Sequence, residues 1–259
     1  MAGRVEAGGG WDSTAVLVDG VWLERTARRP DVEPWLRTET RLLPWLAPRL
    51  PLPVPVPHVV GEDPLVVRHR VLPGEPLTAP TPAQGALLGR FLRALHATPL
   101  PGAVDRGVPG PERNRALRAA ALDRFRGPVA ALLAPPLREP VAALCDRLAA
   151  APADTLVHGD LNPDHLLVDG AGRLTGVIDW SDSRAGDPAK DLAWALAEAP
   201  RGFADALARV YGVTAALADR ARDWHRVGPL YTVAFGRDTG DEALVRLGLA
   251  EAARLLTAP

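Results

Sequence analysis

Apolar and polar positions along the first 72 residues follow the short alternations of β-strands, interrupted by one helical segment. Ala15–Val18 and Val21–Arg25 are strand-like runs that meet at Asp19-Gly20, a hairpin-turn sequence. Leu65–Leu72 predicts a further strand. The proline-rich segment Pro51–Pro57 predicts an extended connector, because proline has no N–H to donate to a helix or to a central strand.

Helical periodicity appears first after Asp31, which is expected to cap a helix that runs to about Leu46. After Thr81-Pro82, a good N-cap sequence, apolar residues recur at helical spacing and the pattern stays largely helical. Further helices are predicted over residues 112–125, 139–148, 188–198, 203–211 and 241–256. The change near Pro73 predicts an α+β chain, with a small β-rich lobe (1–72), a larger helical lobe (73–259) and a cleft between them.

Composition and charge narrow the classes of partner. The formal net charge is −1, so nothing draws this chain to nucleic acid or to an anionic membrane. No apolar segment resembles a signal peptide or a membrane span, and no obligate protein partner is implied. Cys145 stands alone in an apolar helical context and is expected to be a small buried side chain in a cytoplasmic protein. Lys190 is the only lysine, and we expect it to be solvated.

The segment 157–191 carries the residues with catalytic potential. Gly159 allows a tight turn after a strand and places Asp160 at that turn, where its carboxylate is predicted to orient and deprotonate an attacking hydroxyl. Leu174–Ile178 is a short apolar strand that ends at Asp179, the predicted main ligand of Mg²⁺. One carboxylate for a hydroxyl and another for a phosphate-bound metal are the parts that phosphoryl transfer requires.

Two histidines and two further aspartates accompany this pair. His165 follows Asp160 by five residues, and it could ligate the metal, hold a metal-bound water, contact a phosphate or make a structural hydrogen bond. His158 is expected to orient the turn through a backbone hydrogen bond. Asp187 and Asp191 flank a helix start and are predicted to brace the catalytic loop.

These elements together resemble the aminoglycoside phosphotransferase family. His158-Gly159-Asp160, His165, Ile178-Asp179-Trp180 and Gly186–Ala193 match the family pattern in order over about 35 residues. The family usually has asparagine where this chain has His165. It shares the bilobal protein-kinase-like fold and includes choline-, homoserine- and macrolide-type small-molecule kinases, so the resemblance implies the same fold here.

The resemblance also implies ATP or GTP together with Mg²⁺ as cofactors. The family pairs a basic residue of the small lobe with a helix glutamate, and Arg25 and Glu39 are the candidates, with Arg28 and Arg29 as competitors of Arg25. Arginine can bind phosphate through two nitrogens, so it can serve where lysine is usual. The glycine-rich residues 7–13 are expected to cover the phosphates, with Ser13 as one contact. The backbone groups expected to face the base belong to His69, Arg70, Val71 and Leu72.

The acceptor pocket is expected on the helical lobe, and the sequence leaves its chemistry open. A cluster of carboxylates would suit a polycationic antibiotic, and the acidic candidates are Asp182, Glu198, Asp238, Asp241 and Glu242. An apolar site, suited to a macrolide, could instead be lined by Trp194, Trp224, Tyr231 and Phe235.

The predicted function is Mg²⁺-dependent transfer of a nucleotide γ-phosphate to a hydroxyl of a small molecule. The leading acceptor is an antibiotic, either an aminoglycoside, a cyclic peptide or a macrolide, whose phosphorylation would confer resistance. A metabolite kinase of the same fold is the alternative within this class. A non-catalytic, pseudokinase-like protein that binds nucleotide or drug is the alternative from another class.

Overall fold

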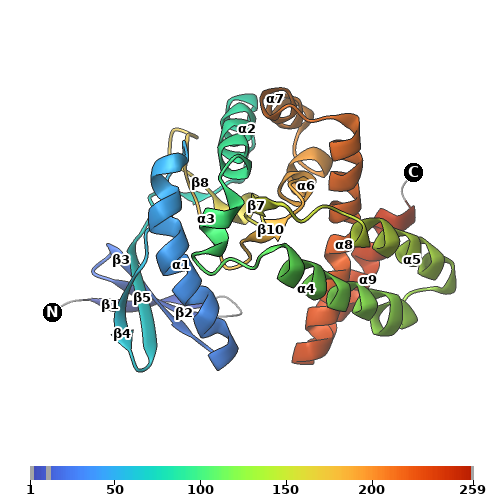
Figure 1. Cartoon of the computed structure of the whole chain (residues 1–259), viewed down its shortest axis with the longest axis horizontal. Helices are drawn as coiled ribbons and strands as arrows, with labels where there is room; N and C mark the ends of the chain where they lie inside the picture. Colours follow the sequence, from blue (N-terminus) through green and yellow to red (C-terminus); the bar gives the residue numbers. More distant parts are fainter. Residues whose placement is uncertain (1–2, 10–12, 258–259) are drawn as a thin grey trace.

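The structure is a computed structural model that describes residues 3–9 and 13–257. A five-stranded antiparallel sheet forms one end of the molecule (Figure 1). Its strands lie in the order β1-β2-β3-β5-β4, with a tight turn at Asp19 and Gly20 between β2 and β3. The five strands are β1 (Arg4–Gly9), β2 (Ser13–Val18), β3 (Trp22–Ala27), β4 (His58–Glu62) and β5 (Leu65–Arg70).

Helix α1 (Glu33–Leu46) packs against this sheet and links it to the rest of the molecule (Figure 1). Near its start, Leu36 packs with Val32 and with Leu65 and Val67 of β5 in a small core of their own. Toward its end, three fully buried leucines belong to the main core of the helical part: Leu42, Leu43 and Leu46. The apolar face of one helix therefore ties the sheet to the helices.

The predicted cap at Asp31 is wrong. A 3₁₀ turn, Pro30–Val32, precedes α1 and moves the start of the helix to Glu33. The Asp31 carboxylate accepts a hydrogen bond from Arg29 instead, and no side chain caps α1. Proline at the start of the turn favours this extra turn because its fixed φ suits the first helical positions.

Short strands lie between the sheet and the helices. β6 (Glu75–Pro76), β8 (Leu166–Val168) and β9 (Leu174–Val177) form a three-stranded sheet. β7 (Thr155–Val157) pairs antiparallel with β10 (Arg184–Gly186). The turns that follow β7 and β9 carry the residues singled out from the sequence.

Helices build the remainder of the chain (Figure 1). Thr81 begins α2 with a capping box, since its hydroxyl accepts from the Gln84 N–H and the Gln84 side chain accepts from the Thr81 N–H. The helices are α2 (Pro82–His96), α3 (Leu100–Val104), α4 (Pro111–Arg124), α5 (Pro135–Ala149), α6 (Ala189–Ala197), α7 (Arg201–Tyr211), α8 (Ala215–Thr239) and α9 (Glu242–Thr257).

The predicted α+β class, with a small β-rich part and a larger helical part, is confirmed. The longest helix, α8, was not predicted. Its buried residues Leu217, Ala221, Trp224 and Val227 do recur at helical spacing, but Pro229 lies inside the helix and obscures the pattern. Across residues 3–9 and 13–257, no helix is both long and apolar enough to cross a bilayer.

Candidate active site

The turn after β7 is shaped by a glycine that no other residue could replace without strain. Gly159 adopts a φ of +91°, and a Cβ built on it would lie 2.3 Å from the backbone oxygen of Asp182. Asp191, at the start of α6, accepts hydrogen bonds of 2.8 Å from the N–H groups of both His158 and Gly159. The buried carboxylate of Asp191 therefore holds the turn that presents Asp160 in place.

His158 connects this turn to the strand that leads to Asp179. Its ring is fully buried, its Nε2 donates to the Ile178 carbonyl at 2.9 Å, and its Nδ1 accepts from the Asp160 N–H at 3.3 Å. The predicted backbone hydrogen bond is thus present. Burial lowers the pKa of His158, in keeping with a neutral ring that donates through one nitrogen and accepts through the other.

A buried chain of polar groups supports Asp191. His96 of α2 hydrogen-bonds Asp191 Oδ2 through Nε2 at 3.0 Å, and Tyr211 hydrogen-bonds His96 Nδ1 at 2.8 Å. Burial alone would raise the pKa of Asp191, but hydrogen bonds from His96 and from the catalytic turn lower it overall. Sequence reasoning missed His96 and Tyr211, because a single histidine at a helix end carries no signal of its distant partner.

Asp187 ties α6 to α8. One of its carboxylate oxygens accepts from the Ala189 N–H, and the other accepts from Arg220 Nε and Trp224 Nε1, each at 3.0 Å. The bracing predicted for Asp187 therefore includes two partners on the helix that the sequence did not predict.

His165 lies between the two carboxylates that the sequence paired. Its Nδ1 is 3.8 Å from Asp160 Oδ2, and its Nε2 is 3.5 Å from Asp179 Oδ2. Nδ1 also lies 2.7 Å from the backbone oxygen of Asp160, to which it can only donate. Because Nδ1 carries the proton in the neutral ring, Nε2 carries the lone pair. This lone pair faces Asp179. Asp160 and Asp179 therefore converge on one imidazole from opposite sides.

Asp160 is open to a ligand but lies in a concave site. Its side chain is 56% exposed. Partial burial, and then the nearby negative charge of Asp182, raise the pKa of Asp160, whereas His165 and Lys190 act in the other direction. A carboxylate with a raised pKa is a stronger base than an ordinary aspartate, which suits a group that takes a hydroxyl proton.

Asp179 is held in a backbone conformation that few residues adopt. Its φ is +61°, which costs of order 1–3 kcal/mol for a residue other than glycine and is typical of functional positions. Burial alone would raise the pKa of Asp179, but His165, Arg25 and a 2.9 Å hydrogen bond from Ser181 lower it overall. Asp179 is therefore kept ionised and available as a metal ligand.

The donor atoms fit a magnesium ion that is shared with a phosphate. A carboxylate oxygen and an imidazole nitrogen at 3.5 Å can coordinate one cation side by side. Within residues 3–9 and 13–257, no group of three His, Cys, Asp or Glu side chains forms a metal cage. Magnesium typically takes one or two protein ligands and completes its shell with water and substrate phosphates, so two ligands suffice.

Arg25 and Glu39 form the predicted pair beside Asp179. Arg25 Nη1 lies 2.7 Å from Glu39 Oε2, and Arg25 Nε donates to Ser13 Oγ at 3.1 Å. Burial raises the pKa of Glu39, Arg25 lowers it, and the charge of Asp179 raises it further, so these three groups share one site. The other oxygen of Glu39, Oε1, is buried without a partner in the described structure. Arg28 and Arg29 are exposed.

The predicted phosphate loop and base-binding segment are only partly placed. Residues 10–12 of the loop lie outside the described residues, and Ser13 begins β2. In the base-binding segment, the Val71 N–H already donates to the Val21 carbonyl at 2.9 Å, so it is not available to a base. His69 is buried and hydrogen-bonds the Arg70 carbonyl. Leu72 and the remaining backbone groups stay predictions.

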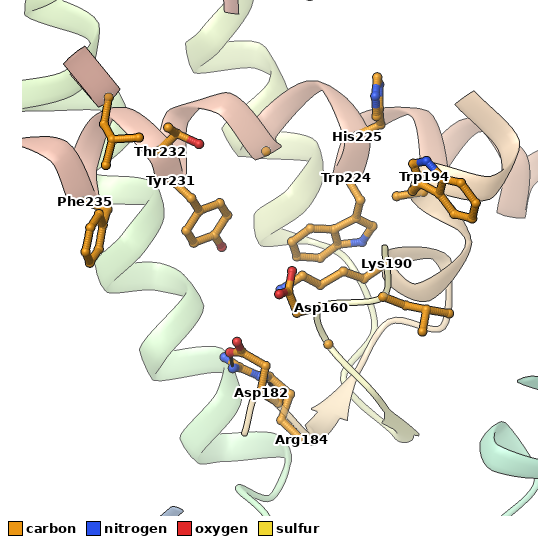
Figure 2. A pocket seen from close by; sticks show the side chains of 15 residues that line it. Asp160, Asp182, Arg184, Lys190, Trp194, Trp224, His225, Tyr231, Thr232 and Phe235 are labelled. Atoms are coloured by element: carbon orange, nitrogen blue, oxygen red, sulfur yellow. Dashed lines mark hydrogen bonds and ion pairs between the residues drawn. The ribbon is translucent and has the colours of Figure 1, made fainter. Parts of the chain in front are cut away.

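A cavity of about 600 Å³ opens beside Asp160 (Figure 2). Its wall combines Asp160, Asp182 and Arg184 with α6 and α8, and all four aromatic residues considered from the sequence line it: Trp194, Trp224, Tyr231 and Phe235. The volume matches pockets that bind small molecules.

Of the predicted acceptor-binding carboxylates, only Asp182 lines this cavity, and a role for the others stays a prediction. Asp238 forms a bidentate pair with Arg124, and Asp241 caps α9 through the N–H groups of residues 243 and 244. Glu198 pairs with His225 at 2.7 Å, and Glu242 sits in the first turn of α9. None of these four lines the cavity beside Asp160. Caps and ion pairs, which the sequence did not reveal, hold these residues outside the lining of the cavity, although Glu198 adjoins it through His225.

The expectation that Lys190 is solvated is also wrong. Lys190 lines the cavity, and its side chain runs beneath Trp224 toward Asp160 (Figure 2). It sits on the first turn of α6, whose N-terminus is fixed by Asp187 and Asp191, so the fold directs it inward. In the sequence, Lys190 lies between Asp187 and Asp191 and therefore looks like a surface residue. The sequence does not reveal that both aspartates are buried.

Comparison with known proteins places the chain in a family. The model of the phosphotransferase enzyme family matches residues 4–230. The chain belongs to this family. The resemblance to aminoglycoside phosphotransferases is thereby confirmed, and so is the bilobal kinase-like fold.

Two curated relatives match the phosphotransferase-family chain over short segments. An uncharacterized protein, YcbJ of Bacillus subtilis (strain 168), is 53% identical over 38 residues, 12% of its own length. Viomycin phosphotransferase of Streptomyces vinaceus is 51% identical over 41 residues, 14% of its own length. Each match spans 15% of this chain.

Solved structures of the family are similar over nearly the whole chain. The GDP and kanamycin complex of APH(2")-IIia has a TM-score of 0.86 at 22% identity, over 98% of this chain and 92% of that one. Macrolide 2'-phosphotransferase MphH from Brachybacterium faecium has a TM-score of 0.74 at 28% identity, over 100% and 92% of the two chains. At 22% identity, the similarity to the APH(2")-IIia complex supports the fold alone.

Proposed function

We propose that this protein is a Mg²⁺-dependent O-phosphotransferase that moves the γ-phosphate of ATP or GTP to a hydroxyl of a small molecule, with an antibiotic as the acceptor class. The observation that carries the proposal is the convergence of Asp160 and Asp179 on opposite nitrogens of His165, beside a cavity of about 600 Å³. The names of the viomycin and macrolide phosphotransferases support an antibiotic as the acceptor.

The acceptor hydroxyl binds against Asp160. The carboxylate orients the hydroxyl for in-line attack and accepts its proton as the new O–P bond forms and the bond to the leaving nucleoside diphosphate breaks. Asp160 is suited to this task because burial and Asp182 raise its pKa. The buried hydrogen bonds from the catalytic turn to Asp191 hold this carboxylate in place, so its orientation costs little at the moment of reaction.

The nucleotide phosphates lie on the opposite side of His165, toward Arg25. Asp179 and His165 would hold Mg²⁺, which when bound neutralises the charge of the phosphates. Arg25 is held by Glu39 and Ser13 and steadies the phosphates from the small lobe. In this proposal residues 1–72 serve the nucleotide, and residues 73–259 carry the catalytic loop, the metal ligands and the acceptor pocket, in a cytoplasmic enzyme.

The test is phosphoryl transfer by the purified chain and by its Asp160→Asn variant. We expect a mass gain of one phosphoryl group on at least one hydroxylated antibiotic when the chain, Mg²⁺ and ATP or GTP are present. In Asp160→Asn, kcat should fall by about 10²–10⁴-fold, because the base is lost. The nucleotide KM should change little, since Asp160 lies on the acceptor side.

The matched control is Asp164→Asn. Asp164 is an exposed aspartate on the 3₁₀ turn Pro163–His165, close to Asp160 in the chain, and its side chain is not among the hydrogen-bonded groups of the site. This variant should keep the activity of the unmodified chain. Transfer that survives in Asp160→Asn at the original rate, or is absent from every acceptor with both nucleotides, would refute the proposal.

A further inference from the structure

The acceptor cavity contains a cation, Lys190, that forms no salt bridge within the described residues, although Asp182, Asp160 and Asp191 act on it at longer range. The Lys190 ammonium lies 5.7 Å from the ring centre of Trp224 and 5.6 Å from that of Tyr231. Within the residues that the structure describes, these cation–π contacts are its only close interactions, without a hydrogen bond or ion pair. Aromatic faces attract a cation through the ring quadrupole but do not neutralise its charge.

The carboxylates around Lys190 are already engaged. Asp182 is hydrogen-bonded to Arg184. Asp187 accepts three hydrogen bonds from α6 and α8, and Asp191 holds the catalytic turn. Asp160 remains, and in the proposed reaction its oxygens face the acceptor hydroxyl. The ammonium of Lys190 is therefore left for the bound acceptor.

A second cation lies in the hollow next to the cavity. This hollow measures about 250 Å³ and shares Lys190, Trp224 and Tyr231 with the main cavity, and Arg118 lines it as well. The Arg118 guanidinium donates to backbone carbonyls, at 2.7 Å to Ala151 and 3.2 Å to Pro152, and forms no ion pair within the described chain. Asp187 lines the same hollow and offsets part of the charge of Arg118.

We infer that the acceptor carries an anionic group and a flat apolar face, and that Lys190 is the residue that selects it. This inference rests on the proposed function and specifies its acceptor. The apolar face packs against Trp194, Trp224, Tyr231 and Phe235, and the anion accepts a charge-assisted hydrogen bond from the Lys190 ammonium. A polycationic acceptor would place its ammonium groups against Lys190 and is disfavoured by like-charge repulsion.

The local electrostatics agree with this arrangement. Burial lowers the pKa of Lys190 and the positive charge of Arg184 lowers it further, whereas Asp182, Asp160 and Asp191 raise it without offsetting these two effects. Desolvation and a neighbouring cation therefore both make the ammonium costly in the free protein. An acceptor anion relieves that cost when it binds, so the interaction favours anionic over neutral ligands of the same shape.

Three small alcohols of matched shape test the charge preference. They are 4-(hydroxymethyl)benzoate, its methyl ester and 4-(hydroxymethyl)benzylamine, which share the ring and the hydroxyl but carry negative, no and positive charge. Lys190 is the only lysine, so protein labelled with ¹³C at lysine Cε gives one NMR signal from the cavity. The benzoate should shift this signal with a Kd about tenfold lower than the ester, as one charge-assisted hydrogen bond predicts, and the benzylamine should bind more weakly than the ester.

Variants then assign the preference to Lys190. Calorimetric titration of Lys190→Met should remove the difference between benzoate and ester, and Lys190→Glu should favour the benzylamine. Arg201→Met is the matched control, because Arg201 is a surface cation whose side chain is 93% exposed on α7. It should bind the three alcohols as the unmodified chain does.

Four results would overturn the inference. They are tighter binding of the benzylamine than of the benzoate, no shift of the Lys190 signal by any of the three alcohols, an unchanged preference in Lys190→Met, and an equal loss of affinity for all three alcohols in that variant. The last would assign Lys190 to the site's general structure rather than to selection. The NMR titration on the unmodified chain does not depend on how the variants fold.

The binding experiment also separates this inference from the proposed function. The titrations contain no nucleotide and require no turnover. Charge selectivity at Lys190 could thus be present in a chain that transfers no phosphate, which would refute only the proposed function. Phosphoryl transfer that favours polycationic antibiotics would refute only the inference.

Discussion

At the scale of single residues, the site depends on buried partners that control where each charge lies. His158 and His165 have the same ring, but His158 bridges two segments of backbone, whereas His165 donates through Nδ1 and leaves Nε2 for a ligand. Asp160 and Asp191 likewise have opposite pKa shifts: burial and then the charge of Asp182 raise the pKa of Asp160, whereas hydrogen bonds from several donors outweigh burial and lower that of Asp191. Residues of the same type therefore differ in hydrogen bonding and pKa because their neighbours differ.

The buried Asp191 should make a measurable, pH-dependent contribution to stability. We expect Asp191→Asn to lower the free energy of unfolding at pH 7 by about 3 kcal/mol, because an amide cannot accept all the hydrogen bonds of the carboxylate. Since the pKa of Asp191 is lowered in the folded state, its contribution is complete above the pKa of an unfolded aspartate, about 3.9, and is lost as pH falls through the lower folded value.

Urea unfolding of the two proteins between pH 7 and pH 3.5 measures this contribution. The difference in unfolding free energy between the unmodified chain and Asp191→Asn should be constant down to about pH 4.5 and then narrow. A difference that widens as pH falls would show that Asp191 is protonated in the folded protein, contrary to the hydrogen bonds described above. Asp205→Asn, at an exposed position of α7, is the control and should match the unmodified chain.

At the scale of secondary-structure elements, helix starts and turns deliver the functional side chains. The first turn of α6 carries Lys190 into the acceptor cavity and Asp191 beneath the catalytic turn, one residue apart. Helix α8 supplies Trp224 and Tyr231 from one face, two turns apart. α2 supplies His96 from its last turn. The placement of α2 therefore matters for a catalytic loop that lies far from it in the sequence.

The capping box of α2 should stabilise the folded protein. Thr81→Ala should lower the free energy of unfolding by about 1 kcal/mol, because the Gln84 N–H then loses its acceptor. Thr81→Ser keeps the hydroxyl and is expected to stay within about 0.5 kcal/mol of the unmodified chain. Denaturant unfolding measures both. Equal losses in the two variants would mean that the threonine methyl group, rather than the cap, stabilises this end of the helix.

At the scale of the whole molecule, the site joins groups from both parts of the chain. Arg25 and Glu39 come from β3 and α1, and both interact electrostatically with Asp179, which follows β9. Because α1 packs one end on the sheet and the other in the helical core, it fixes the distance between these groups. A nucleotide that contacts Arg25 and Asp179 together should stabilise the molecule as a unit.

Nucleotide binding should therefore raise the Tm of the protein, and this rise should depend on Arg25. At 100 times its Kd, Mg²⁺-nucleotide adds about 2.7 kcal/mol, or a rise of roughly 5–10 °C for a chain of this size. In Arg25→Met at the same nucleotide concentration, the rise should be much smaller, because a charged phosphate contact is lost. Thermal unfolding with and without nucleotide measures this.

Arg28→Met and Arg29→Met are the matched controls, since both arginines are exposed close to Arg25 in the chain. The rise in Tm should be preserved in both. If either variant loses it while Arg25→Met keeps it, the phosphate contact belongs to that arginine instead.

Much of the site could be predicted from the sequence because its parts are local. The turn that presents Asp160 and the strand that ends at Asp179 lie within one short segment, and chain connectivity alone brings them near each other. The order of most strands and helices also followed from periodicity, but β4, α3, β10 and α8 with its internal proline were not predicted. Even the long-range pair of Arg25 and Glu39 was predicted from the family pattern, and the structure shows it.

The chemistry of the acceptor cavity was decided only by the tertiary structure. Whether Lys190 or Asp238 faces the cavity depends on how α6, α8 and α9 pack, and surface acids look alike in a sequence whether they line a pocket or pair with a nearby arginine. The sequence by itself determined the turn at Asp160, the strand that ends at Asp179 and the fold class, because these follow from local pattern. Helix packing determined which charges meet the acceptor, because burial and ion pairing arise only between segments that are distant in the chain.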